Sequence, residues 1–163
     1  MTTLLDNISA HFEHALPFVI YRKPNDSIVS AFLMQETALR FVSDFEETGF
    51  VFAPFSSIDK AILFPMEHAL ISSEELTLEN YKENNIVFET DTVDKEAYLK
   101  TVEKAIQQIQ LGHLKKVVIS REELLKIPDF NLMEVYKKLL TTYKNAFVYA
   151  WFHPKVGLWL GAT

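Results

Sequence analysis

The sequence predicts an α+β fold with a mostly antiparallel sheet and helices packed on one side of it. Several short apolar runs are joined by turns of hairpin length, which suits antiparallel pairing. Segments with apolar residues at helical spacing open the chain and interrupt the strands of its second half. Because the hairpin-length links outnumber the crossovers, we expect antiparallel pairs to dominate.

The first half of the chain alternates strands and turns after an opening helix. Apolar residues at helical spacing over 4–15 predict an amphipathic helix that ends before Pro17. Pro24-Asn25 supplies a turn between two strands, and residues 36–45 fit either a short helix or a strand. The predicted strands are short aromatic or β-branched runs at residues 18–21, 28–33, 50–55 and 61–64.

The second half begins with residues 67–92, which are polar and which we interpret as a connecting segment across the surface. A helix follows, with Asp94 as its N-cap and Gly112 in the left-handed position after its end. A second helix starts after Asn131, with Glu134 placed as in a capping box. The predicted strands of this half are residues 116–125, 146–152 and 156–160.

Composition excludes several functional classes. The chain has 163 residues and 48% hydrophobic residues, which predicts a globular protein. Its four glycines lie too far apart to form a phosphate-binding loop. Without cysteine there is neither a disulfide framework nor a thiolate metal site, and His11 with His14 is the nearest approach to a histidine metal pair.

Charge and hydropathy indicate where the protein works. A net charge of −6 without a continuous basic stripe argues against a nucleic-acid partner. The N-terminus lacks the pattern of a signal peptide, and no apolar stretch approaches the length of a membrane span. We therefore expect a cytoplasmic protein with no membrane partner.

Lys116 is the first candidate for chemistry. It enters the apolar run Val117 to Ile119, which predicts a strand buried on both faces. A lysine at the lip of such a strand loses hydration of its charge, and its amine then becomes a base near neutral pH. The alternative is a surface lysine beside an edge strand, as we expect for Lys115. Arg121 is expected to pair with Glu122 or Glu123.

Gly161, Ala162 and Thr163 are the second candidate. Small residues allow a flat ring to approach the backbone, so these three fit a substrate-binding strand end. The alternative is an ordinary strand end. The tyrosines, Trp151 and Trp159 are expected to pack in the core or the hairpin rather than to contact substrate.

From about Tyr98 onward the chain resembles the chorismate-utilising enzymes, and among them isochorismate synthase. The resemblance is carried by residues 106–112, the run 116–121, the aromatic strand 147–152 and the ending 160–163. In the family that ending continues into Pro-Glu. The first half is similar to short bacterial members, but less specifically.

The resemblance implies a role for each candidate residue. Lys116 would be the general base that activates water for attack at C2 of chorismate, because relatives that deliver ammonia usually carry a glutamine there. Gly161, Ala162 and Thr163 would bind the substrate. The fold would be an incomplete part of the chorismate-utilising enzyme fold, with residues 1–92 as a strand-rich N-terminal segment and residues 93–163 as the first part of the catalytic region.

The resemblance also implies groups that the sequence does not contain. The general acid would be the glutamate after this Gly-Ala-Thr, and the carboxylates that hold Mg²⁺ would come later still. We therefore expect an N-terminal fragment, inactive by itself, with Mg²⁺ only in the complete enzyme. A homodimer through the truncated sheet edge is expected as well.

Two alternatives stay open. A salicylate synthase shares the lysine and then eliminates pyruvate from the isochorismate. A non-catalytic α+β module that binds a partner protein would need no further catalytic residues. An isochorismate synthase would serve menaquinone or siderophore synthesis.

Overall fold

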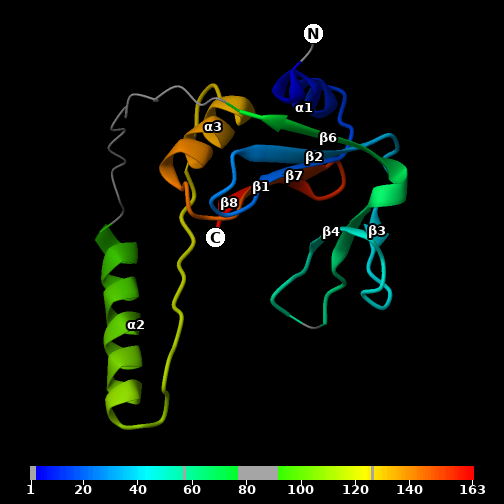
Figure 1. Cartoon of the computed structure of the whole chain (residues 1–163). Helices are drawn as coiled ribbons and strands as arrows, with labels where there is room; N and C mark the ends of the chain where they lie inside the picture. The colour runs from blue at the N-terminus through cyan, green and yellow to red at the C-terminus, as the bar shows by residue number, and fades with distance from the viewer. Residues whose placement is uncertain (1–2, 57, 77–91, 126) are drawn as a thin grey trace. The chain divides into compact units, whose positions relative to one another are not determined.

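The chain forms two compact units in the computed structural model (Figure 1), which describes residues 3–56, 58–76, 92–125 and 127–163. Met1–Tyr81 and Asn131–Thr163 make up the first, here called the sheet unit. Lys82–Phe130 make up the second, here called the helical unit. Strands from both sides of residue 92 join in the sheet unit, so residue 92 does not separate compact units. The assignment of residues 93–163 to a catalytic region stays a prediction.

The sheet unit is built on a five-stranded sheet in the order β6-β2-β1-β7-β8, and every neighbouring pair is antiparallel. The predicted antiparallel α+β class is therefore confirmed. The hairpins around Pro24 and Pro154 form as expected, because each turn follows an apolar run that pairs with the next one. The strands are β1 Phe18–Arg22, β2 Ile28–Met34, β6 Ala69–Glu75, β7 Val148–His153 and β8 Gly157–Ala162.

Two helices cover one face of this sheet, α1 (Leu4–Glu13) and α3 (Leu132–Thr142) (Figure 1). Thr3 and Asp6 form a complete capping box at the start of α1, and Asn131 accepts the amide of Glu134 at the start of α3. The packing of helices on one side of the sheet is thus confirmed for this unit. The core of this face comprises Leu4, Ile8, Phe18, Ile20, Val29, Ala31, Leu33, Leu132, Tyr136, Leu140, Val148 and Ala150.

A small three-stranded sheet, in the order β3-β5-β4, packs on the opposite face. Phe64 of this sheet lies buried with Val19, Phe32 and Trp151 of the large one. The strand prediction over 61–64 is confirmed, whereas that over 50–55 holds only as far as Phe52, and only two residues of 36–45 form a strand. The strands are β3 Arg40–Phe41, β4 Gly49–Phe52 and β5 Ile62–Pro65.

The interpretation of residues 67–92 as a connecting segment is wrong for its first part. After the short 3₁₀ helix η1 (Met66–His68), residues Ala69–Glu75 form β6 and pair with the whole length of β2. The polar side chains find partners across the sheet: the Ser73 hydroxyl lies 2.9 Å from that of Ser30. A polar sequence can therefore form a strand where its neighbour supplies both backbone and side-chain partners. Residues 77–91 lie outside the described residues.

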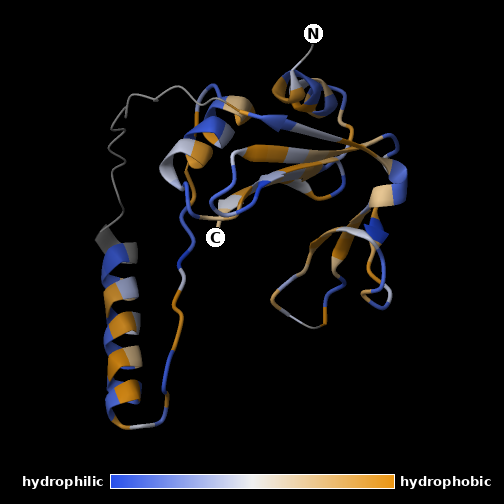
Figure 2. Cartoon of the chain, viewed as in Figure 1, coloured by the Kyte–Doolittle hydropathy of each residue, from blue (hydrophilic) through white to orange (hydrophobic). Residues whose placement is uncertain are grey.

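The helical unit contains α2 (Thr92–Gln110), along which apolar and polar residues alternate (Figure 2). Gly112 has a φ of 76°, so the predicted left-handed position after the helix is confirmed. Asp94 lies within the helix and not at its N-cap, because the helix begins two residues earlier. Among the described residues, no helix is long and apolar enough to cross a membrane.

The predicted strand at residues 116–125 is absent. This stretch has no strand conformation, and Val118 is 81% exposed. A strand needs a neighbour for its backbone groups, and the described residues of the helical unit supply none to this stretch. The apolar, β-branched residues favour a strand, but this local pattern does not show whether another strand lies beside them to pair with.

Candidate functional site

Lys116 lies in the helical unit, in the stretch that lacks strand conformation, and its side chain is exposed. The expected setting, at the lip of a buried strand, is therefore wrong for this structure. Five residues on, Arg121 pairs with Glu123, which confirms the interpretation of Arg121 as an ion-pair residue. The described residues place no ion-pair partner at Lys116. Its role as a base stays a prediction.

Gly161 and Ala162 lie in β8 of the sheet unit, and Gly161 does face a flat ring. That ring is Tyr149, its register partner on β7. A Cβ added to Gly161 would lie 2.6 Å from both Cζ and Oη of Tyr149. The small residue is thus explained by packing within the chain. Substrate binding by this glycine stays a prediction.

Thr163 holds the end of the hairpin through two backbone hydrogen bonds. The amide of Phe147 donates to the Thr163 carbonyl at 2.8 Å, and the amide of Thr163 donates to the Phe147 carbonyl at 3.0 Å. Residues 161–163 are therefore fixed as one continuous strand end against β7. The structure brings these three together, whereas Lys116 belongs to the other unit.

Arg22 holds the segment between α3 and β7 through hydrogen bonds, a role that the sequence analysis did not predict. The side chain is 5% exposed, and its guanidinium donates to four backbone carbonyls at the end of α3 and beyond it. The signal available in the sequence was an arginine directly after the apolar strand Phe18–Tyr21. Such an arginine lies where a guanidinium can reach the unpaired carbonyls of a helix end.

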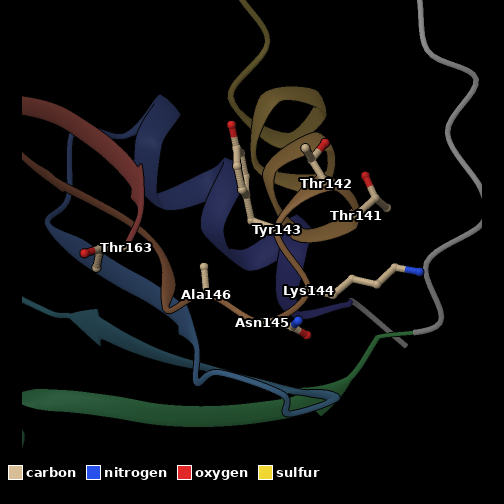
Figure 3. A pocket seen from close by; sticks show the side chains of 7 residues that line it. All are labelled: Thr141, Thr142, Tyr143, Lys144, Asn145, Ala146 and Thr163. Atoms are coloured by element: carbon tan, nitrogen blue, oxygen red, sulfur yellow. The ribbon is translucent and has the colours of Figure 1, made fainter.

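A shallow pocket of about 550 Å³ lies at the same helix end (Figure 3). Thr163 lines it, so one of the predicted substrate-binding residues faces a cavity. The side chains of Tyr143, Lys144 and Asn145 point in different directions and do not converge on a common point (Figure 3). The full lining is Thr141, Thr142, Tyr143, Lys144, Asn145, Ala146 and Thr163.

A second pocket, of about 580 Å³, carries a charged cluster. Glu36 pairs with Arg40, and His68 lies between two carboxylates, 3.6 Å from Glu36 and 3.4 Å from Glu67. Hydrogen bonding and charge from Arg40 lower the pKa of the Glu36 carboxyl. In the part of the chain that is described, no group of three or more metal-binding side chains gathers to hold an ion.

Trp151, Trp159 and His153 pack within the sheet unit. Trp151 is buried and stacks on Trp159, with ring centroids 6.0 Å apart and planes inclined by 7°. This agrees with the expected packing role of both. His153 is buried, its Nδ1 accepts the amide of Lys155, and burial lowers the pKa of its ring. Its Nε2 is buried without a hydrogen-bond partner in the described residues.

Comparison with known proteins identifies the family. The family model described as chorismate binding enzyme matches residues 54–163, which is more than half of the chain. This range includes Lys116 and Gly161 to Thr163. No curated protein and no solved structure gives a match. By the family match, together with its antiparallel α+β fold, the chain belongs to the chorismate-binding enzyme family.

Proposed function

We propose that this chain carries the water-activating part of an isochorismate synthase. A chorismate-utilising function follows from the family match over residues 54–163. The observation that carries the finer assignment is the lysine at position 116, inside the matched range. Water needs a base to become a nucleophile, whereas ammonia already has a lone pair. A lysine at this position therefore favours water as the group added to chorismate.

The proposed chemistry is an allylic exchange of hydroxyl groups. Lys116 takes a proton from water, the water oxygen bonds to C2 of chorismate, both conjugated ring double bonds shift by one position, and the C4–O bond breaks. The departing hydroxyl takes up a proton from the general acid that the resemblance implies, so one water is added and one is lost. No carboxylate among the described residues holds the Lys116 amine in an ion pair, so the amine is not committed to an acidic partner.

Gly161, Ala162 and Thr163 are proposed to bind the substrate through the strand end. The support is that this end is rigidly paired with Phe147 and that Thr163 faces a pocket. The family's Mg²⁺ would be held by carboxylates that the described residues do not supply, so no step is assigned to it. The product would enter menaquinone or siderophore synthesis, in the cytoplasm.

The test is chorismate turnover by the complete gene product in ¹⁸O-labelled water. With Mg²⁺ in the buffer, chromatography and mass spectrometry should detect isochorismate that carries one labelled oxygen at C2. Salicylate with pyruvate would support a salicylate synthase instead. Amination of chorismate by ammonia in place of water would contradict the assignment of Lys116.

A further inference from the structure

We infer that Arg22 is a positioning residue that fixes the strand end Gly161–Thr163 in the place where chorismate would bind. The inference rests on the proposed substrate-binding role of that strand end. Two sets of hydrogen bonds within the sheet unit connect Arg22 to Thr163. The first joins Arg22 to backbone carbonyls as far as Ala146, and the second joins the next residue, Phe147, to Thr163.

The first step joins strand β1 to the end of α3. Nη1 of Arg22 donates to the carbonyl of Leu140 at 3.0 Å. Nη2 donates to the carbonyls of Tyr143, Lys144 and Ala146 at 2.5, 2.9 and 3.2 Å. The last carbonyls of a helix have no partner within the helix, and one planar guanidinium satisfies several of them here. It thereby holds the connection between α3 and β7 in one conformation.

The second step joins this connection to the strand end. Ala146, the last acceptor of Arg22, immediately precedes Phe147, which exchanges two backbone hydrogen bonds with Thr163. A shift of the connection would therefore move Phe147 and open the pairing at Thr163. The positive charge of Arg22 has no carboxylate partner in the described residues, so its acceptors are these carbonyl dipoles.

Lysine and methionine cannot replace the hydrogen bonds that Arg22 donates. Lysine has three donors around a single nitrogen, and it cannot reproduce the planar fork that spans four carbonyls. Methionine fills the volume and donates nothing, so these carbonyls lose the hydrogen bonds that Arg22 supplies. The neighbour Lys23 is exposed and carries the same charge, which makes it a matched control.

The experiment is amide hydrogen exchange by NMR on the chain, with chorismate titration of the complete gene product that carries the same substitutions. In Arg22→Lys and Arg22→Met we expect protection at Phe147 and Thr163 to fall by about tenfold or more relative to amides at the centre of β1. We expect the dissociation constant for chorismate to rise by about fivefold or more in both variants. Lys23→Met should change neither quantity.

A stability control separates positioning from general weakening. Ile8→Ala removes a fully buried side chain from α1 and leaves all the carbonyls around Arg22 in place. If Arg22→Lys lowers protection evenly over the sheet, as Ile8→Ala should, or leaves Thr163 unchanged, the inference is overturned. If the complete gene product binds no chorismate, the proposed function fails, while selective exchange at Thr163 in the Arg22 variants would still establish that Arg22 fixes the strand end.

Discussion

The phenol ring of Tyr149 lies directly over the backbone of Gly161, so closely that a Cβ at Gly161 would lie 2.6 Å from its Cζ. The two residues are register partners on β7 and β8. The Tyr149 ring is itself packed, 6.1 Å from the ring of Phe147 and 6.1 Å from that of Phe52 between centroids. The glycine is therefore a requirement of this aromatic packing.

Replacing Gly161 by alanine should displace the ring and weaken the hairpin. Gly161→Ala is expected to lower the free energy of unfolding by about 1–3 kcal/mol, the usual cost of overpacking. Urea unfolding followed by tryptophan fluorescence measures it. In a Tyr149→Leu background the same substitution should cost less, because the ring is gone. An equal cost in both backgrounds would show that the ring does not set the requirement.

The sequence predicted those elements whose partners are close along the chain. The hairpins β1-β2 and β7-β8 and the helix α3 follow from local turns, caps and apolar spacing. The sequence failed to predict β6, whose polar residues form a strand because β2 lies beside them. It also failed for residues 116–125, whose apolar run finds no pairing strand within the described part of the chain. Strand formation depends on a partner that a local pattern does not show.

In the candidate site, too, the sequence predicted local properties but not the long-range contacts. The small residues at 161–163 predicted close approach of a substrate ring, which stays a prediction; the ring that the structure places at Gly161 is that of Tyr149, and this pairing depends on the register of β7, which is a long-range property. Arg22 reaches carbonyls more than a hundred residues away in the sequence, so its neighbours show an arginine at the end of a strand but not the acceptors that it contacts.

The base assignment predicts different effects of two adjacent lysines. In the complete gene product, Lys116→Gln should lower kcat by about 10²-fold or more, with a smaller effect on KM, because a general base acts in the transition state. Lys115→Gln removes the same charge one residue away and should leave both constants within about a few-fold. Steady-state chorismate kinetics measure both. Equal losses would make Lys116 an ordinary surface lysine.

His153 should make the stability of the sheet unit depend on pH. Burial is the main cause that lowers the pKa of this ring below 6.5 in the folded chain; the nearby Lys155 adds a smaller decrease, and the backbone of Ala38 opposes both. The unfolded chain binds a proton more readily, so stability is complete above about pH 6.5, falls as pH drops below it, and levels off below the folded pKa.

Urea unfolding between about pH 7.5 and pH 5 measures this loss, because the lowered carboxyl pKa values of Asp6, Glu36 and Glu47 act only in more acidic solution. His153→Asn keeps an acceptor near the position of Nδ1 and should flatten the profile. His14→Asn, at an exposed position, should leave the profile unchanged. A slope that survives His153→Asn would assign it to another group.

The edge strand β8 is expected to pair with β8 of a second copy. It has no charged residue, and its outer side has no partner among the described strands, whereas the opposite edge strand β6 carries Glu74 and Glu75. Because Thr163 exchanges both its backbone hydrogen bonds with Phe147, the alternation of antiparallel pairs turns the amide of Leu160 outward.

Size-exclusion chromatography with light scattering should show a dimer at micromolar concentration. Leu160→Pro removes the outward amide and should give a monomer, while Leu160→Val keeps the amide and should stay dimeric. A monomeric unaltered chain would show that the neutral edge is not enough for association, and the free backbone groups of β8 would then be solvated as in an ordinary edge strand.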